Sequence, residues 1–556
     1  MLKTLYSLFI LIILLFFSSW SFSQVSYDSE EADKLLNEEK FQEAAELYKQ
    51  LINENIYNGY LWSNYGYCLY KTGNYQMAIE MFNKAINIGY ESSSNAYNIA
   101  CCYSLLKDPL NAVKWIHITA KYKFNNIEKT VKEDKDFDNI RNDKIFQEEV
   151  LPSPEMLKDR ILGWKTDLKF MKRRMEETHF NINRVISKQD WDIKFSKLEE
   201  NIEALDDAQI FTELMKITAS VGDGHTSIYS GQDGKFMLHY LPLQFFMFED
   251  GLYVIQVSAE YKELAGKKIK KIGNTNTNDL LEKIKPVASL DNELALKWTG
   301  MFILTENDIL YGLGITEKNN ETEITTEDGN KVTVRSATEK ENPIHSPPGR
   351  INWIKGWKTD PAPLYLKNRG EMYWYEYIPV NQMVYMQLNG IGNKPDEKLN
   401  EFALRVFRFI DTSEVKYFVL DIRFNGGGNN TLNKALVQEI IKSEKINKVG
   451  SFFTIIGRNT FSAAQCLANS LENETNVIFA GEPTGSKPNF VGESSMILLP
   501  YSGSQVNCSS RYWQSYFSDD LRQWIAPQLA VKYYYNDYYM GNDPAMNAVL
   551  KYISRK

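Results

Sequence analysis

Residues 452–465 read FFTIIGRNTFSAAQ, and this stretch decides the fold of the larger part of the chain. Four of its first five residues are apolar and do not alternate with charged residues, which is typical of a strand buried on both faces. Gly457 to Thr460 predict a turn, and the residues from Phe461 onward predict a helix. Ser462 is therefore expected at the N-terminus of a helix that directly follows a buried strand.

Two interpretations fit a serine at this position. With Gln465 three residues later, Ser462 matches a capping box, in which the hydroxyl satisfies a backbone N–H of the helix. The position also suits a nucleophile, because the helix dipole and free N–H groups favour an alkoxide and a developing oxyanion.

A second buried strand, KYFVLDIR at 416–423, precedes the glycine-rich loop FNGGG at 424–428. Its glycines allow backbone N–H groups to face a ligand closely, so the loop is able to hold an oxyanion. An ordinary glycine turn is the alternative interpretation.

Downstream of Ser462, the strand NVIFA at 476–480 leads into GEPTGSKPN at 481–489. Lys487 lies in this segment, 25 positions after Ser462. A lysine amine that is desolvated in a cleft can act as a base, whereas the alternative is a solvated lysine at the surface.

Far upstream, VGDGHT at 221–226 places a glycine on each side of Asp223. This pattern predicts a tight turn that presents His225 at a surface rather than on a helix face. A single histidine is more often structural than catalytic, so His225 becomes a candidate only together with the other motifs.

Four motifs in order, DGHT (223–226), DIRFNGGG (421–428), NTFSAAQ (459–465) and GEPTG (481–485), resemble those of the C-terminal processing peptidase and tricorn core peptidase family. The resemblance covers roughly residues 155–550. It implies an α/β core of the Clp-protease and crotonase type at 370–550, with residues 221–230 contributing, a helical cap at 155–220 and an inserted PDZ-like module.

Residues 241–290 fit the inserted module weakly. LPLQFF at 241–246 and LYVIQV at 252–257 predict strands, and GKKIKKIG at 266–273 resembles a late strand and turn of a PDZ module. The glycine-rich loop that binds a carboxylate is not recognisable. An extended peptide is still able to add to an open strand edge.

The resemblance implies two kinds of base. Processing peptidases use a lysine after the G-E-x-T motif, which Lys487 matches, and tricorn-like members use the histidine of the first motif, which His225 matches. Ser486, Pro488 and Val491 replace the glycines and the glutamine expected around the lysine. We therefore favour His225 and keep Lys487 as the alternative base.

The remaining roles also follow from the resemblance. The backbone N–H groups of Gly427 and Ala463 would bind the oxyanion. The tricorn-like pattern places an acid late in the core, where Asp519 and Asp520 are the candidates and Asp520 is chosen. Asp223 is a local alternative.

A repeat with a period of 34 residues occupies the chain from about residue 28 to residue 122. Ala44, Ala78 and Ala112 are separated by 34 positions, as are Tyr48, Phe82 and Ile116. The period resembles that of tetratricopeptide repeats. Residues 28–150 are thus expected to form three repeats and a capping helix that buries Phe137, Ile140 and Phe146. Such an array recruits a protein partner through its concave groove or, alternatively, spaces or dimerises the enzyme.

The first residues, MLKTLYSLFILIILLFFSSWSFSQ, predict a signal peptide at 1–23 that is cleaved after Ser23. The uninterrupted apolar run from Leu8 to Phe17 is about half the length that spans a bilayer, and an uncleaved anchor is the alternative. No later segment is long and apolar enough to span. The mature chain is therefore expected to be periplasmic or extracellular, without a membrane span.

Composition excludes several classes of function. A net charge of -8 leaves no basic face for phosphates, which argues against nucleic acid as a partner. Five cysteines are too few for a disulfide framework or a zinc site, so free thiols are expected, with Cys466 and Cys508 the one pairing to check. No metal, nucleotide or other cofactor motif is present.

These observations predict an exported serine endopeptidase that cleaves peptides or unstructured proteins without a cofactor. One alternative is a catalytically inert scaffold that binds peptides. Another is a processing peptidase with a Ser/Lys dyad. Acyl transfer on the same core would require a coenzyme A signature that the sequence lacks.

Overall fold

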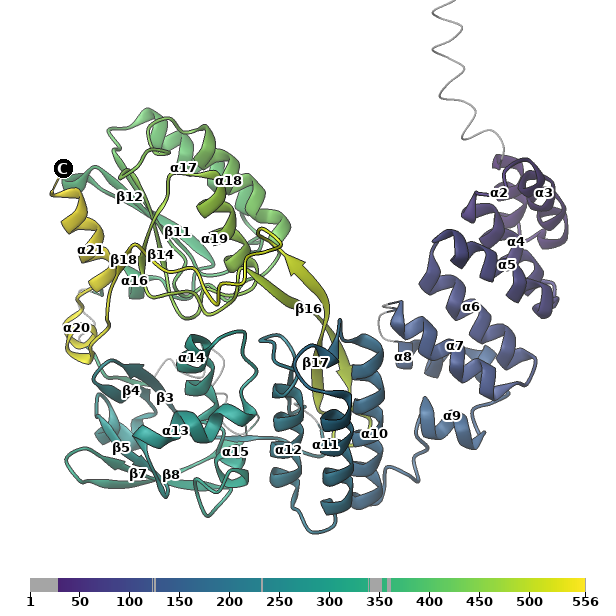
Figure 1. The fold of residues 1–556 in the computed structure, drawn as a ribbon, viewed down its shortest axis with the longest axis horizontal. Coiled ribbons are helices and arrows are strands. Elements are labelled where there is room, and N and C mark those ends of the chain that lie inside the picture. The colour runs from purple at the N-terminus through teal and green to yellow at the C-terminus, as the bar shows by residue number, and fades with distance from the viewer. Residues whose placement is uncertain are drawn as a thin grey trace, which may run out of the picture. The chain divides into compact units, whose positions relative to one another are not determined.

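The computed structural model describes residues 29–122, 124, 127–231, 234–338, 340, 353–357 and 362–555. The chain forms two compact units, which divide between Leu162 and Gly163 (Figure 1). The predicted signal peptide lies outside the described residues. Within the described residues, no helix has both the length and the hydrophobicity needed to cross a membrane.

Helix pairs build the first unit. They are α2 (Glu30–Asn37) with α3 (Phe41–Glu54), α4 (Gly59–Lys71) with α5 (Tyr75–Ile88), and α6 (Ser92–Leu105) with α7 (Pro109–Lys121). Ala44, Ala78 and Ala112 are fully buried. A Cβ added to Gly66 on α4 would lie 2.9 Å from the ring of Phe82 on α5, so the absence of a side chain at Gly66 allows these two helices to approach closely.

The segment predicted as one capping helix is divided. It contains α8 (Ile127–Glu133), a 3-10 turn (Lys135–Phe137) and α9 (Lys144–Glu149). Asp134 and Asp143 interrupt the helix because each accepts a hydrogen bond from a backbone N–H two residues later and so begins a new element. The three predicted apolar residues are buried: Phe137, Ile140 and Phe146.

Three helices occupy the segment predicted as a helical cap: α10 (Arg160–Thr178), α11 (Lys188–Asn201) and α12 (Asp207–Ala219). Asp206 and Gln209 form a capping box that fixes the start of α12. The chain then turns through residues 220–226 into β1 (Ser227–Tyr229), which pairs with β17 (Gln505–Gln514). The segment with His225 therefore connects α12 of the cap to β1, the strand that pairs with β17.

The module predicted at 241–290 contributes to two sheets that also contain strands from outside these residues. Its first sheet contains β3 (Leu243–Phe248), β4 (Gly251–Val257) and β10 (Ile354–Lys355). Its second sheet contains β5 (Ile269–Ile272), β6 (Thr275–Asn276), β7 (Glu321–Thr326) and β8 (Lys331–Arg335), and α13 (Thr277–Ile284) follows β6. Between α13 and β7 the chain forms α14 (Glu293–Ile303) and α15 (Asn307–Gly312).

The core contains a six-stranded sheet with the order β11-β12-β13-β14-β15-β18. Its strands are β11 (Tyr373–Ile378), β12 (Met383–Leu388), β13 (Tyr417–Asp421), β14 (Phe452–Ile456), β15 (Ile478–Gly481) and β18 (Leu529–Ala530). Neighbours from β12 to β18 run parallel, and β11 is antiparallel to β12. The buried strands predicted before the two motifs are confirmed as β13 and β14, which pair in parallel.

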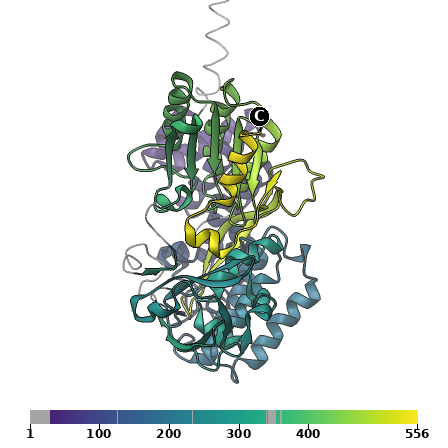
Figure 2. The same ribbon diagram turned by 90° about the vertical axis from the view of Figure 1, so that its left-hand side faces the viewer.

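Helices cover both faces of this sheet (Figure 1, Figure 2). One face is packed by α17 (Leu399–Thr412), α18 (Asn433–Lys442) and α19 (Ala463–Glu474), and the other by α21 (Pro544–Ile553), which follows α20 (Tyr535–Met540). The long hairpin of β16 (Asn489–Leu498) and β17 leaves the core and pairs with β1 beside the cap. All five cysteines are free and buried, so Cys466 and Cys508 are not paired.

A buried ion network fastens α21 to the end of β13. Arg423 donates to both oxygens of Asp543 at 2.9 and 2.8 Å, and its Nε donates to Asp421 at 3.0 Å. Tyr385 donates to the second oxygen of Asp421 at 2.7 Å. Each buried charge is thus compensated, which such a position requires. The network fixes the strand end from which the glycine-rich loop begins.

Candidate active site

Ser462 stands where β14 passes into α19, as predicted. Its backbone has φ 55° and ψ -123°, a left-handed conformation that costs free energy for a residue with a side chain. The Ser462 hydroxyl does not cap α19, and the Gln465 amide donates to Asn469 at 2.9 Å instead. The capping-box interpretation is therefore wrong. The half-buried hydroxyl is held on a sharp turn from strand to helix.

Hydrogen bonds to the neighbouring strand end hold this turn in place. The Thr460 hydroxyl donates to the carbonyl of Ile422 at 3.0 Å, and the Asn459 amide donates to the carbonyl of Phe424 at 2.9 Å. These bonds tie the turn before Ser462 to the loop after β13. The strained backbone of Ser462 is thereby held by its surroundings.

The glycine-rich loop lies against Ser462. A Cβ added to Gly427 would be 2.7 Å from the Ser462 Cβ and 3.1 Å from its Oγ, and Gly427 has φ 113°. Only glycine fits there. The Ala463 N–H has no acceptor among the described residues, whereas the Gly427 N–H donates to Asn425 Oδ1 at 2.9 Å. Both backbone N–H groups that were predicted to bind an oxyanion thus lie next to Ser462. To bind an oxyanion, the Gly427 N–H would have to give up its hydrogen bond to Asn425.

The His225 imidazole is stacked between two phenylalanine rings. Its centroid is 4.3 Å from that of Phe461 and 5.4 Å from that of Phe490. Both ring nitrogens are buried, and neither has a hydrogen-bond partner in the described chain. Phe461 directly precedes Ser462, so the imidazole lies beside the turn that carries the serine. Unpaired buried nitrogens cost free energy and call for a functional explanation.

Asp223 fixes the backbone on both sides of this imidazole. Its carboxylate accepts from the N–H groups of His225 and Thr226 at 3.0 and 2.7 Å. It also accepts from the hydroxyls of Thr226 and Ser509 and from His179 Nε2, at 3.0, 2.8 and 2.9 Å. Asp223, the local alternative for the acid, thus binds the turn rather than the imidazole.

These partners also set the ionisation of Asp223. Burial acts to raise the pKa of this carboxyl group, but the bonds from His179, Ser509 and Thr226 hold it below its usual value. The Asn181 N–H donates to His179 Nδ1 at 3.0 Å, so the proton of His179 sits on Nε2 and points at Asp223.

Asp291 is a residue of the site that the sequence motifs do not indicate. Its Oδ1 accepts from the Gly224 N–H at 2.8 Å, and its Oδ2 accepts from the Ser486 hydroxyl at 2.5 Å. Burial raises the pKa of Asp291, and a positive charge on His225 would lower it. The carboxyl group therefore lies within electrostatic reach of the imidazole. In the sequence, Asp291 and Asn292 resemble only the cap of the following helix.

The other predicted groups have different surroundings. The Lys487 amine is half-buried and has no hydrogen bond or ion pair with any described residue. Asp520 pairs with Arg522 at 2.8 Å, and Arg522 also binds Glu472 at 2.7 Å. Among the described contacts, none joins His225 to Lys487, Asp519 or Asp520. The structure thus places Gly427 against Ser462 and Ala463, and the His225 ring against Phe461, the residue before Ser462. It engages Asp520 in an ion pair.

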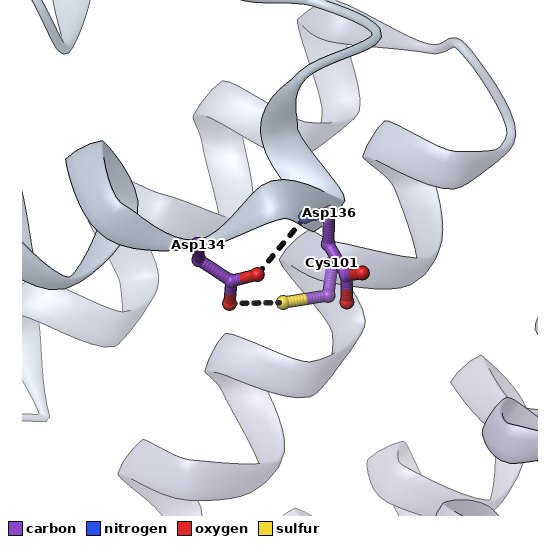
Figure 3. A group of neighbouring side chains, drawn as sticks. All are labelled: Cys101, Asp134 and Asp136. Atoms are coloured by element: carbon purple, nitrogen blue, oxygen red, sulfur yellow. Dashed lines mark hydrogen bonds between the residues drawn. The ribbon is translucent and has the colours of Figure 1, made fainter.

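In the first unit, Cys101, Asp134 and Asp136 form a cluster of potential metal ligands within 4.8 Å of one another (Figure 3). Hydrogen-bond donors already occupy both carboxylates: Tyr97 donates to Asp134 at 2.7 Å, and Tyr70 donates to Asp136. Burial raises the pKa of the Cys101 thiol well above its usual value, which disfavours the thiolate that a metal requires. These contacts explain the cluster as a link between the capping segment and the repeat helices.

Comparisons with known proteins bear on both units. A family model described as tetratricopeptide repeat matches residues 59–90, and no curated protein matches the sequence. Solved structures similar to this chain include mature CPAF, with a TM-score of 0.48, 11% identity and coverage of 71% of this chain and 98% of that one. The photosystem II D1 C-terminal processing protease has a TM-score of 0.34, 12% identity and coverage of 69% and 98%.

The tricorn protease has a TM-score of 0.33, 13% identity and coverage of 71% of this chain and 37% of that one. Both kinds of peptidase that the motifs resemble are thus among the structures similar to this chain. At 11–13% identity these similarities concern the fold and not the chemistry.

Asp223→Asn should lower the free energy of unfolding by about 3 kcal/mol at pH 7, because it removes a charged acceptor of several buried hydrogen bonds. The pKa of Asp223 is lower in the folded chain than its usual 3.8, so the carboxylate stabilises the fold above about pH 4. That contribution disappears as the pH falls below this value. The difference between the two proteins, measured by urea unfolding, should therefore narrow in acid.

Asp279→Asn is the matched control, since Asp279 is exposed on α13. It should change the free energy of unfolding by less than about 0.5 kcal/mol. An equal effect of the two substitutions at pH 7 would contradict the role given to Asp223.

Proposed function

We propose that the chain is a serine peptidase in which Ser462 is the nucleophile and His225 is the general base. The observation that carries the proposal is the imidazole with two buried, unpaired nitrogens beside a serine that is held in a strained turn at a helix N-terminus. The free N–H of Ala463 and the close approach of Gly427 support it, since hydrolysis of an amide requires oxyanion donors at this place.

In this mechanism Ser462 Oγ attacks the carbonyl carbon of a peptide bond while His225 accepts its proton. The negative charge on the carbonyl oxygen is stabilised by the N–H groups of Ala463 and Gly427, each worth about 3 kcal/mol. His225 then donates the proton to the leaving amine. Water, deprotonated by the same imidazole, hydrolyses the acyl-enzyme and releases Ser462.

Asp291 acts in this proposal as the positioning acid, in place of Asp520. It binds the backbone of Gly224, next to His225, and its charge favours the imidazolium that forms during the reaction. The ion pair of Asp520 with Arg522 leaves Asp520 less suited to this role.

The remaining parts of the function are also proposals. The helical repeats would recruit a protein partner, because paired helices of this kind present a concave surface. Export is proposed from the sequence of residues 1–23 alone.

A fluorophosphonate probe should label the chain, and Ser462→Ala should abolish both labelling and cleavage of an unstructured protein such as β-casein. Ser470→Ala is the matched control, because Ser470 lies on the same helix and should keep full labelling. Labelling is read by gel fluorescence and cleavage by the loss of intact casein. Labelling that survives Ser462→Ala would favour the inert scaffold.

His225→Ala should lower kcat on a fluorogenic peptide by about a thousandfold, because it removes the proton acceptor. Lys487→Ala should leave kcat nearly unchanged, since its amine has no described contact with the site. Steady-state kinetics of the two variants separate the two bases. The reverse pattern would establish the Ser/Lys dyad instead.

Asp291→Asn should lower kcat by about a hundredfold with little change in KM, since a positioning acid acts on the transition state and not on substrate binding. Asp520→Asn should leave both parameters near those of the unsubstituted chain. Thermal unfolding of each variant shows whether a loss of kcat reflects a loss of structure. A large effect at Asp520 with none at Asp291 would restore Asp520 as the acid.

A further inference from the structure

A cavity of about 520 Å³ lies outside the site described above. It is bounded by β3 and β4 of the inserted module, by α14, and by the residues that follow core strands β13 and β14. Ser462, His225, Gly427 and Asp291 do not line it. The volume is within the range of sites for small molecules.

Aromatic side chains form most of the walls of this cavity. Trp298, Trp353 and Trp357 line it together with Phe246 and Phe424. Flat rings of this kind favour an aromatic ligand, because stacked and edge-to-face contacts add to the burial of apolar surface. The aromatic walls therefore indicate a ligand that contains an aromatic ring.

Two of the cations that line the cavity are already paired. Arg423 is bound by Asp421 and Asp543, and Arg458 is bound by Glu482 at 2.9 and 2.5 Å. These two arginines are structural and leave no charge for a ligand.

Arg369 and Lys355 also line the cavity, and within the described part of the chain no carboxylate pairs with either of them. The Arg369 guanidinium lies 3.5 Å from the ring centroid of Phe424, and the Lys355 amine lies 5.7 Å from that of Trp357. Both residues are exposed, so their charges are accessible to a ligand that enters from solvent. A guanidinium placed in this way offers a charge and several donors to an anion.

We propose that this cavity binds an aromatic anion, with its ring among the tryptophans and its negative group on Arg369. Two kinds of ligand have this chemistry: a small aromatic acid, and a peptide segment with acidic and aromatic residues. In the second case the site selects substrates, which rests on the proposed function. The binding itself does not depend on it.

The test uses the full chain carrying Ser462→Ala and the fluorescent aromatic anion 8-anilinonaphthalene-1-sulfonate. N-acetyl-L-tryptophan, which has a carboxylate, should displace this probe at concentrations about tenfold lower than its neutral amide, N-acetyl-L-tryptophanamide. Arg369→Gln should abolish this preference. Arg511→Gln should retain it, because Arg511 stacks on Trp513 outside the cavity and provides a matched cation–aromatic pair.

Trp298→Leu gives a second, independent readout. It should weaken binding of the probe, of the acid and of the amide alike, since it removes a wall and no charge. Thermal unfolding of both variants confirms that they fold. Equal displacement by acid and amide in the chain with Arg369 would overturn the proposal, as would probe binding that neither Arg369→Gln nor Trp298→Leu changes.

A blocked peptide, acetyl-Glu-Trp-Glu-amide, distinguishes the two kinds of ligand. Displacement of the probe by this peptide as well as by the free acid supports a peptide segment as the ligand. Displacement by the free acid alone supports a small aromatic acid. None of these measurements requires hydrolysis, so their failure leaves the chemistry of Ser462 untouched, and an inactive Ser462 leaves the cavity proposal untouched.

Discussion

The candidate site depends on the hydrogen bonds that the buried carboxylate of Asp223 accepts. It accepts hydrogen bonds from His179 after α10, from the turn with His225 and from Ser509 on β17. It therefore joins the helical cap, the turn and the long hairpin at one point. The same hairpin carries Phe490 on β16, whose ring stacks on the imidazole. His225 is consequently positioned by the cap and the hairpin, whereas Ser462 is positioned by the core sheet.

The backbone of Ser462 has an independent support. Ser462 follows β14, and side chains of the turn before it bind the carbonyls that follow β13, so two adjacent parallel strands determine its backbone. This arrangement explains how a left-handed conformation persists at a residue with a side chain: the surrounding hydrogen bonds stabilise it. The His225 ring contacts Phe461, the residue before Ser462, where two separately built parts of the second unit come together.

Much of this could be predicted from the sequence because the signals are local. Continuous apolar runs identify β13 and β14, and the 34-residue period identifies the helix pairs. Asp291 could not be predicted from the sequence, because its hydrogen-bond partners Gly224 and Ser486 are 67 and 195 positions away. No local sequence pattern indicates contacts over such separations. Strands β7 and β8, of which β7 pairs with β5 of the predicted module, do not stand out in the sequence because they are rich in threonine and charged residues. The division of the capping helix depends on two aspartates that a periodic pattern does not register.

The aromatic cavity and the strained serine share one turn. Gly457 and Arg458 line the cavity and also lead from β14 to Ser462. Arg458 binds Glu482 of the core and donates to the carbonyl of Met247 on β3 at 2.7 Å, so it connects the inserted module to this turn. Its guanidinium also stacks on Phe246, another residue of the cavity wall. A ligand in the cavity would therefore touch Arg458, the buried side chain that joins β3 to the backbone before Ser462.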